Sequence, residues 1–505
     1  APTCTPTTCA SLNHNCGNWT DGCSGTLSCG VFGNGSCQTG QTCNATGSCI
    51  QQIGYICGNN IIEPGEACDG SDLNGYNCSS VAAGFKSGTL RCNTNCKSYD
   101  VSQCVVGNTI NALSCSQTDI QAAINNASNG YTVNVPAGNC VWTNPICISG
   151  SNYCTPVHIF KKSIVLKGAG IDKTNITSSF PVEWYNNVMV VENQGMQPTR
   201  VTGFTFTRST SITIALSNVI NFRVDHCKFN DNTQASIAVG SSRGVIDHCI
   251  VINSNIGIRN SGDNDASWNR PIIPGTSDAV FAEDNIFIAD KSGTQDCGSL
   301  NEQIYHDSWG ARSTVRNNLF DGSACNKDFA PFEAHGNWPN PPYTARGVVM
   351  IEAYNNIFKA YKTYRFMHFR GGSLLIFNNS MTYLSGGRPA AIALTDENDW
   401  QTAFFNPLDT TWSAQDQVFN SFFWDNTMNN LPVNESDVWL WNALDAPFIQ
   451  KNRDYWMHAP NTTGGRTEWI DPSNPGADNN EILVSGANAY YPYTPYAYPH
   501  PLTLI

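Results

Sequence analysis

The sequence predicts a mainly β solenoid, and two observations in its central region lead to that prediction. The first is a short phrase that recurs between residues 201 and 428: a β-rich run, a small or polar residue, one spacer, then usually an aromatic. It reads VTGFTF at 201–206, VDHCKF at 224–229, IDHCIV at 246–251, EDNIF at 283–287, RNNLF at 316–320, YNNIF at 354–358, FNNSM at 377–381 and WDNTM at 424–428. A unit this short cannot bury its own apolar face, so we expect each repeat to be one coil stacked on the next.

The second observation is a column of matching residues, one from each repeat. It begins at Phe204 and continues through Cys227, Cys249, Asn285, Asn318, Asn356, Asn379 and Asn426. The shortest steps are 22 or 23 residues and the longest is 47, which indicates that some coils carry inserted loops. Stacked coils would place these side chains about 4.8 Å apart. Because an amide both donates and accepts, the asparagines are expected to form a hydrogen-bonded structural ladder.

The VDHC and IDHC phrases resemble the coil motif of pectate lyases, and the asparagine column resembles their asparagine ladder. This resemblance covers roughly residues 110–430. It implies the right-handed parallel β-helix of the pectin-lyase-like superfamily. That fold also occurs in hydrolases, phage adhesins and surface proteins without catalytic activity, so it does not define a function by itself.

Composition divides the 505 residues into four parts. We expect Cys-rich modules at 1–52 and 53–106, the β-helix at 107–430, and an aromatic, Pro-rich extension at 431–505 that packs on the β-helix or on a neighbouring subunit. At the start of the β-helix, a capping box of Ser116 and Asp119 followed by spaced apolar residues predicts an amphipathic helix. Such a helix would cover the open edge of the first coil.

The cysteines and charges restrict the environment and the partners. The 22 cysteines fall into even-numbered groups, which indicates disulfides formed outside the cytoplasm. Because the chain starts at Ala1, we expect an extracellular or cell-surface protein, secreted after signal-peptide removal. No long apolar run predicts a membrane span, and the net charge of −13 argues against nucleic acid as a partner. Cys92 and Cys96 have a zinc-like spacing without a matching second pair, so no metal site is assigned.

Four carboxylates in the second Cys-rich module, Glu63, Glu66, Asp69 and Asp72, could hold calcium through oxygen ligands. Their spacing is not diagnostic, so a solvated acidic turn is the simpler interpretation. Calcium is the single cofactor that the sequence leaves open.

Two stretches carry residues suited to acid–base chemistry. Asp225 and Asp247 recur one coil apart, each followed by a histidine, at positions 226 and 248. Stacked polar residues at turns commonly satisfy the backbone, so we favour a structural role for these pairs. The second stretch, residues 333–370, interleaves cations with aromatics, which suits an acidic polysaccharide.

Candidate site residues follow from the second stretch. If the chain is an enzyme, the candidate catalytic residues are His335, Arg346 and Arg370, and the carbohydrate-binding residues are Lys359, Lys362, Arg365 and His368. A lyase would use such groups to neutralise a uronate carboxylate and to remove the neighbouring proton.

The catalytic motifs known from the superfamily's enzymes are incomplete here. The polygalacturonase motifs are represented by a single His-Gly pair, at 335–336, and Arg270 does not complete the Arg-x-Pro-x-x-Arg phrase of pectate lyases. The sequence therefore favours a secreted structural or adhesive β-helix glycoprotein that assembles with copies of itself into a filament or surface layer and contacts a polysaccharide or glycan. The alternative is a carbohydrate-active enzyme, a polysaccharide lyase or glycoside hydrolase, acting on an acidic polysaccharide.

Asn-x-Ser/Thr sequons supply candidate glycosylation sites. They occur at Asn18, Asn34, Asn44, Asn77, Asn126, Asn175, Asn378, Asn434 and Asn461.

Overall fold

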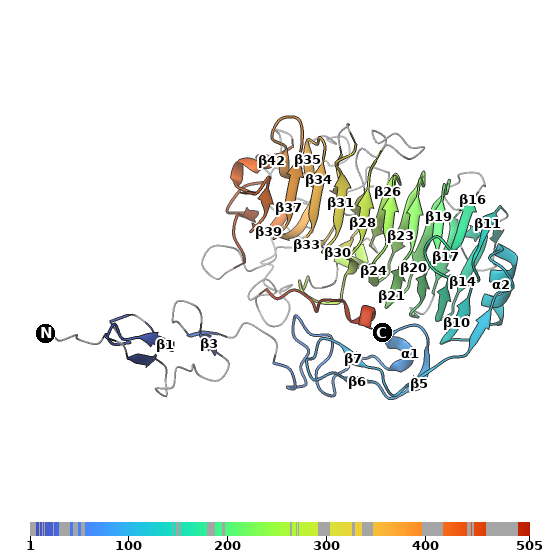
Figure 1. The fold of residues 1–505 in the computed structure, drawn as a ribbon, viewed down its shortest axis with the longest axis horizontal. Coiled ribbons are helices and arrows are strands. Elements are labelled where there is room, and N and C mark those ends of the chain that lie inside the picture. The colour runs from blue at the N-terminus through green and yellow to red at the C-terminus, as the bar shows by residue number, and fades with distance from the viewer. Residues whose placement is uncertain are drawn as a thin grey trace.

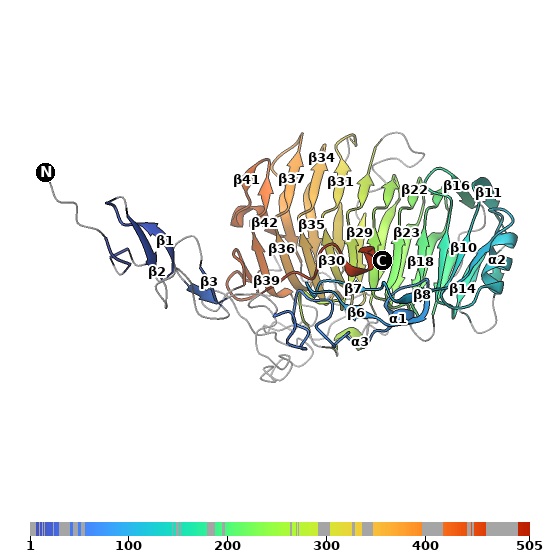
Figure 2. The same ribbon diagram turned by 60° about the horizontal axis from the view of Figure 1, so that its bottom comes forward.

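The computed structural model describes residues 7–29, 41–43, 49–51, 56–178, 187–290, 304–335, 347–395, 418–460 and 493–504, with short gaps inside several of these ranges. Its body is a right-handed parallel β-helix built from three long sheets, and each coil adds one strand to each sheet in turn (Figures 1 and 2). The predicted fold class is therefore confirmed.

The first sheet has twelve strands within the described ranges, and each strand pairs in parallel with the next. Its strands are β9 (Thr109–Asn111), β10 (Tyr131–Asn134), β15 (Ile164–Lys167), β18 (Arg200–Thr202), β21 (Phe222–Asp225), β24 (Gly244–Asp247), β27 (Val280–Glu283), β30 (Arg312–Arg316), β33 (Met350–Tyr354), β36 (Gly372–Phe377), β39 (Val418–Trp424) and β43 (Tyr455–Trp456).

The second sheet has eleven strands in the described part of the chain and is parallel except at its last pair. Its strands are β11 (Gly138–Trp142), β16 (Thr174–Ser178), β19 (Thr205–Thr207), β22 (Lys228–Asn230), β25 (Ile250–Ile252), β28 (Ile286–Ile288), β31 (Leu319–Gly322), β34 (Ile357–Ala360), β37 (Ser380–Tyr383), β40 (Thr427–Met428) and β41 (Leu431–Pro432).

The third sheet has ten described strands, all parallel. They are β14 (Val157–Phe160), β17 (Asn187–Glu192), β20 (Ile212–Ser217), β23 (Ala235–Gly240), β26 (Ile256–Ser261), β29 (Tyr305–Ser308), β32 (Phe332–Ala334), β35 (Arg365–Phe369), β38 (Ala390–Leu394) and β42 (Val438–Leu440).

The ladder residues lie at the turn from the twelve-stranded to the eleven-stranded sheet. The amide of Asn356 donates to Asn379 Oδ1 at 3.0 Å, and its own Oδ1 accepts from the backbone N–H of Asn318 at 3.1 Å. The same pattern runs from Asn285 to Asn426. Cys227 and Cys249 continue the column as buried free thiols, and the Cys249 N–H donates to Asn285 Oδ1.

The left-handed residue of this turn is the one before each ladder member, because that is where the chain reverses. His226, His248, Asn317 and Asn355 have φ between 48° and 57°. Asparagine, aspartate and histidine tolerate this conformation better than most residues. The residue pairs HC, DN and NN of the repeat thus combine a left-handed corner residue with the inward ladder residue that follows it.

The core is a stack of side chains two residues beyond each ladder position. Phe287, Phe320 and Phe358 are fully buried, and their rings stack with centroids 4.7 and 4.8 Å apart. These are the aromatics of the repeated phrase, and their burial supplies the apolar contacts that hold neighbouring coils together.

The predicted capping helix is α2 (Gln117–Asn126), which lies across the first coils (Figure 1). It buries Ile120, Ala123 and Ile124, as its periodicity predicts. Only one of the two hydrogen bonds of the capping box forms. The Ser116 hydroxyl accepts from the Asp119 N–H, whereas the Asp119 carboxylate accepts from the Ser114 hydroxyl and not from the Ser116 N–H. Ser114 is close enough in sequence to compete for that carboxylate.

The N-terminal segments are short antiparallel pairs and small helices. They comprise β1 (Gly17–Thr20) with β2 (Thr26–Cys29), β3 (Gln41–Cys43) with β4 (Cys49–Gln51), α1 (Cys78–Val81), β5 (Phe85–Gly88) with β8 (Cys104–Val106), and β6 (Arg91–Cys92) with β7 (Tyr99–Asp100). The remaining short elements are β12 (Ile146–Cys147) with β13 (Cys154–Thr155), α3 (Asp265–Trp268), and 3-10 turns at Glu435–Asp437 and Pro501–Leu504.

Disulfides hold these segments together. Six of the bonds join residues 9–29, 57–96, 68–92, 78–104, 115–140 and 147–154, and Cys16, Cys23 and Cys325 are also disulfide-bonded. Cys92 and Cys96 are both in disulfides, so neither is available as a zinc ligand. The bonds place folding of the chain in an oxidising compartment outside the cytoplasm. No helix in the described ranges combines the length and apolar character that a membrane crossing requires.

The C-terminal segment folds back between the β-helix and the second Cys-rich module (Figure 1). The buried guanidinium of Arg316 donates to the carbonyls of Tyr496 and Ala497 at 2.6 and 2.7 Å, and pairs with Glu283. One apolar cluster combines Phe281 of the β-helix with tail residues and with Cys-rich-module residues. Gly275 must be glycine here, because its φ is 75° and a Cβ would lie 1.9 Å from the carbonyl oxygen of Thr494.

Candidate active site on the ten-stranded sheet

A row of ionisable side chains crosses the outer face of the ten-stranded sheet. Arg259, His306, Glu333 and His368 are in register on β26, β29, β32 and β35. The residues before and after them in strand sequence point into the core, since successive side chains alternate between faces. On the next strand, β38, the position in register with His368 is Ala393, so the ionisable residues occupy four successive coils.

A second row lies two residues further along the same strands. His335 directly follows β32 and Arg370 directly follows β35, and their N–H groups continue the sheet by donating to Asp307 and Ala334. The Arg370 side chain donates to Glu333 Oε1 through Nη2 and contacts His335 Nδ1 through Nη1 at 3.2 Å. Because a guanidinium cannot accept, His335 Nδ1 is the acceptor and its ring proton lies on Nε2.

Glu333 is the centre of the cluster. Its Oε1 lies 3.7 Å from His335 Nε2 and 3.8 Å from His368 Nδ1, besides accepting from Arg370. The other nitrogen of His368, Nε2, lies 2.8 Å from the hydroxyl of Thr395. One carboxylate is therefore hydrogen-bonded to a guanidinium and lies within 4 Å of two imidazoles.

The imidazoles are neutral at physiological pH. Burial, followed by the charges of nearby arginines, lowers the pKa of His335 to about 3. The pKa values of His306 and His368 are also lowered, again first by burial. His335 and Arg370 each retain 13% side-chain exposure, whereas Glu333 has none. Solvent and ligands therefore reach the cluster at this pair.

An aromatic platform borders the cluster. The guanidinium of Arg365 lies 4.4 Å from the ring centre of Trp441, and the ring of His368 lies 5.3 Å from it. Trp441 is 45% exposed. An exposed indole beside cations can stack on a sugar face while the cations hold an anionic group.

The structure separates the carbohydrate-binding residues expected from sequence. Arg365 and His368 lie in the cluster, but Lys359 is on β34 of the eleven-stranded sheet, with its Nζ 3.8 Å from Asp321. Lys362 follows in the connecting turn, with its Nζ 5.4 Å from the ring centre of Tyr364. A strand change between residues 360 and 365 thus divides a stretch that is continuous in sequence.

Other residues of this cluster were not assigned from sequence. Glu333 lay in the basic stretch without a role, and His306, Arg259 and Trp441 lay outside it. Arg346, the third candidate catalytic residue, lies outside the described residues.

The aspartates of the Asp–His pairs on the twelve-stranded sheet are ion-paired with arginines. Asp225 is fully buried and accepts two hydrogen bonds from Arg200, at 2.7 and 2.8 Å, and one from Thr202. Asp247 accepts two from Arg223 at 2.9 Å. Each carboxylate also lies within hydrogen-bond distance of Nδ1 of the histidine that follows it, at 2.8 Å for His226 and 2.9 Å for His248. These contacts satisfy the buried carboxylates, which supports the structural role favoured above.

The sequons differ in how the structure uses their asparagines. Asn77 and Asn434 cap short helical turns, and the side chains of Asn175 and Asn378 each donate to a neighbouring asparagine. Asn18 and Asn126 are exposed. Asn34, Asn44 and Asn461 lie outside the described residues.

No family model and no curated protein matches the sequence. Among solved structures, the chain is similar to an alginate lyase from Paenibacillus sp. str. FPU-7, with 11% identity over 66% of this chain and 98% of that chain and a TM-score of 0.38. It is also similar to the A-module of the Azotobacter vinelandii mannuronan C-5 epimerase AlgE4, with 12% identity over 64% of this chain and 88% of that chain and a TM-score of 0.35. A GH87 alpha-1,3-glucanase catalytic domain in complex with nigerose has 8% identity over 70% of this chain and 68% of that chain, with a TM-score of 0.27.

Proposed function

We propose that this protein is a carbohydrate-active enzyme that binds an acidic polysaccharide across the ten-stranded sheet and removes a proton from a uronate unit. The observation that carries the proposal is the buried cluster of Glu333, His335, His368 and Arg370 on the outer face of that sheet. Buried ionisable groups with strongly shifted pKa values concentrate at functional sites. The assignment reverses the preference for a non-catalytic protein that the incomplete motifs suggested.

The donor set favours proton removal over hydrolysis. Glycoside hydrolysis ordinarily needs two carboxylates, one acid and one base or nucleophile. Within the described residues this cluster contains one carboxylate, Glu333, and it is paired with Arg370. Proton removal beside a carboxylate instead needs a cation to neutralise the substrate and a neutral base, and the cluster contains both.

In the proposed reaction, the arginine at position 370 binds the uronate carboxylate, and Glu333 keeps that guanidinium oriented. A neutral imidazole of the cluster accepts the proton from the carbon beside the carboxylate. Elimination then breaks the glycosidic C–O bond at the next carbon, and the departing oxygen takes a proton. The imidazolium formed in the first step supplies that proton, so the base is neutral again at the end of the reaction.

The test is an assay of the full chain on pectate, alginate and glycosaminoglycans, with and without calcium. Elimination leaves an unsaturated sugar that absorbs in the ultraviolet. We expect His335→Gln and Arg370→Ala to lose activity by at least about 100-fold, as for removal of an acid–base group. Lys359→Ala is the control and should retain activity, because Lys359 lies on the eleven-stranded sheet and not on the ten-stranded sheet that carries the cluster.

No product on any uronate polymer would overturn the lyase reaction. Deuterium uptake from solvent at the carbon beside the carboxylate, without elimination, would keep proton removal and change the outcome to epimerisation. Loss of activity in Lys359→Ala to the same extent as in Arg370→Ala would overturn the placement of the site.

One observation favours assembly with other copies as a second function. Ile286, Leu319 and Ile357 are in register on the outer face of the eleven-stranded sheet, and Ile286 and Ile357 are 38% and 46% exposed. Exposed aliphatic stripes of this kind mark interaction surfaces. The tail contacts described above are made to the chain's own β-helix, so the stripe is the better surface for assembly.

Light scattering at high concentration tests this second proposal. Parent protein should form particles larger than one chain, and Ile357→Lys should dissociate them. A monomeric parent protein would overturn it.

A further inference from the structure

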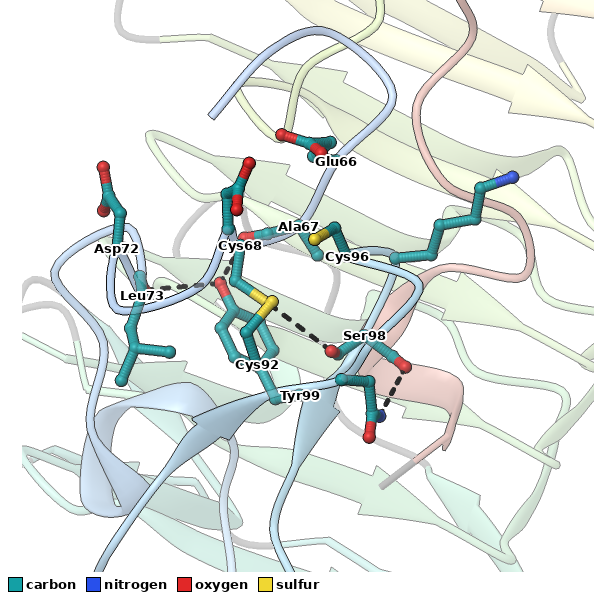
Figure 3. The surroundings of a disulfide bond; sticks show 12 residues. Glu66, Ala67, Cys68, Asp72, Leu73, Cys92, Cys96, Ser98 and Tyr99 are labelled. Carbon is teal, nitrogen blue, oxygen red and sulfur yellow. Dashed lines mark hydrogen bonds between the residues drawn. A yellow bond between two sulfur atoms is a disulfide. The ribbon is translucent and has the colours of Figure 1, made fainter. Parts of the chain in front are cut away.

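A loop of the second Cys-rich module brings three carboxylates together. Glu63, Glu66 and Asp69 each place one carboxylate oxygen within 4.8 Å of the others. The disulfides Cys57–Cys96 and Cys68–Cys92 fix the loop beside them. Figure 3 shows Glu66 on this loop, two residues before Cys68, with the Cys68–Cys92 disulfide drawn below it. The covalent frame therefore preserves the arrangement without any contribution from a metal.

The donors around this cluster are neutral. Asp69 accepts from the N–H groups of Gly58 and Asn59, at 2.5 and 3.2 Å. Glu63 accepts from the Ile56 N–H at 2.7 Å and from the Asn59 side-chain amide at 2.8 Å. Over the described part of the chain, no lysine or arginine forms an ion pair with any of the three carboxylates. Up to three negative charges thus face one another without an ion-paired lysine or arginine from the described residues.

Glu66 is the residue that points to a ligand. It is 2% exposed, and its Oε2 accepts from the Glu63 N–H at 3.1 Å. Its Oε1 is buried and has no hydrogen-bond partner among the described residues. Buried carboxylate oxygens are ordinarily paired, so this one requires a partner that the described part of the chain does not provide. Burial, and then the charges of Asp69 and Glu63, raise the pKa of Glu66 to about 7.

We propose that Glu63, Glu66 and Asp69 bind one calcium ion. Oxygen ligands are what calcium prefers, and its flexible coordination number lets carbonyl oxygens and waters complete the shell around three carboxylates. Zinc is disfavoured because the neighbouring sulfurs of Cys57 and Cys96 are joined to each other and cannot act as thiolates. Magnesium is disfavoured because it retains most of its water and binds few protein carboxylates.

The position of the site gives the ion a structural consequence. The Gly65 N–H donates to the Gly275 carbonyl at 3.2 Å, which joins the loop to the β-helix. The Gly275 N–H in turn donates to Glu352, which also accepts from Tyr493 of the tail. Calcium bound at Glu66 would therefore stabilise the contact between the module, the β-helix and the tail.

Calorimetric titration of the full chain, first stripped with a chelator, tests the proposal. We expect about one calcium per chain, and we expect Glu66→Gln to weaken binding by at least about 100-fold, since even indirect partners of a metal cost 10–100-fold. Asp72→Asn is the matched control: Asp72 is in the same loop but outside the cluster, and its carboxylate accepts from the Asn74 N–H. Its affinity should match that of the parent.

Melting temperature supplies a second readout that separates binding from misfolding. In chelator, Glu66→Gln should melt no lower than the parent, because the substitution removes a buried uncompensated charge. Calcium should raise the melting temperature of the parent and of Asp72→Asn, and leave that of Glu66→Gln unchanged. The proposal is overturned if the parent shows no heat and no melting shift in millimolar calcium, or if Glu66→Gln binds as the parent does.

Discussion

Replacing Asn356 by leucine tests the ladder at one coil. Asn356 is 1% exposed and makes four side-chain hydrogen bonds. Its Nδ2 donates to the Val315 carbonyl at 2.8 Å and to Asn379 Oδ1 at 3.0 Å. Its Oδ1 accepts from the N–H and the side-chain amide of Asn318, at 3.1 and 3.0 Å. Leucine has a similar branched shape and is larger than asparagine, so the substitution removes polar contacts without opening a cavity.

The loss of folding free energy comes mainly from hydrogen-bonding groups that find no other partner in Asn356→Leu. The Asn318 side chain keeps its bonds to the carbonyls of Ala282 and Arg316, and Asn379 Oδ1 still accepts from the backbone N–H of residue 356. The Asn318 backbone N–H loses its acceptor, and a buried amide left unpaired costs about 1–3 kcal/mol. With the smaller net loss of the remaining bonds, we expect destabilisation of about 2–4 kcal/mol.

The measurement is the urea unfolding midpoint with disulfides intact. Asn230→Leu is the control, because Asn230 lies on the outer face of β22 and its side chain makes no hydrogen bond within the described residues. Its effect should be within about 0.5 kcal/mol. If Asn356→Leu unfolds at the same midpoint as Asn230→Leu, the asparagine column does not stabilise the β-helix and the reasoning fails.

Three further predictions concern buried charge and the tail. Burial raises the pKa of Asp307 from 3.8 to about 8, so the folded protein favours the protonated carboxyl and loses stability as the pH rises from about 4 to 8. Asp307→Asn should therefore raise the melting temperature at pH 8 and not at pH 4. Burial lowers the pKa of His306, so the folded protein favours the neutral imidazole and loses stability as the pH falls below about 6.5. His306→Gln should therefore reduce the fall in melting temperature that is measured between pH 6.5 and pH 4. Truncation before Tyr493 removes the carbonyl acceptors of Arg316 and uncovers Phe281, so the melting temperature should fall and binding of a hydrophobic dye should increase; an unchanged melting temperature would contradict the docking of the tail.

The β-helix could be predicted from the sequence because its information is local and repeated. Each phrase contains the left-handed corner residue, the ladder residue and the inward aromatic within five positions, as in Asn317, Asn318 and Phe320. Stacking then needs no long-range information beyond the next copy of the phrase. The amphipathic pattern of α2 is local in the same sense, although Ser114 changed its cap.

The candidate site could not be read in this way, because its register depends on loops of unequal length. His306, Glu333 and His368 are neighbours across three strands, yet 27 and 35 residues separate them along the chain, and no repeated phrase marks their strands. The sequence identified His335 and Arg370 by composition. It could not show that Glu333 joins them, or that Lys359 belongs to another sheet.

What the sequence by itself determined was the coil and its ladder, since both follow from residue types a few positions apart. What only the tertiary structure decided was which side chains meet across coils, and which are covered. Arg316 illustrates the difference. Within its repeat it is a polar residue before a turn, whereas in the fold it is fully buried between Glu283 and the carbonyls of the tail. Burial of a charge depends on segments far apart in the chain, and a local pattern contains no record of them.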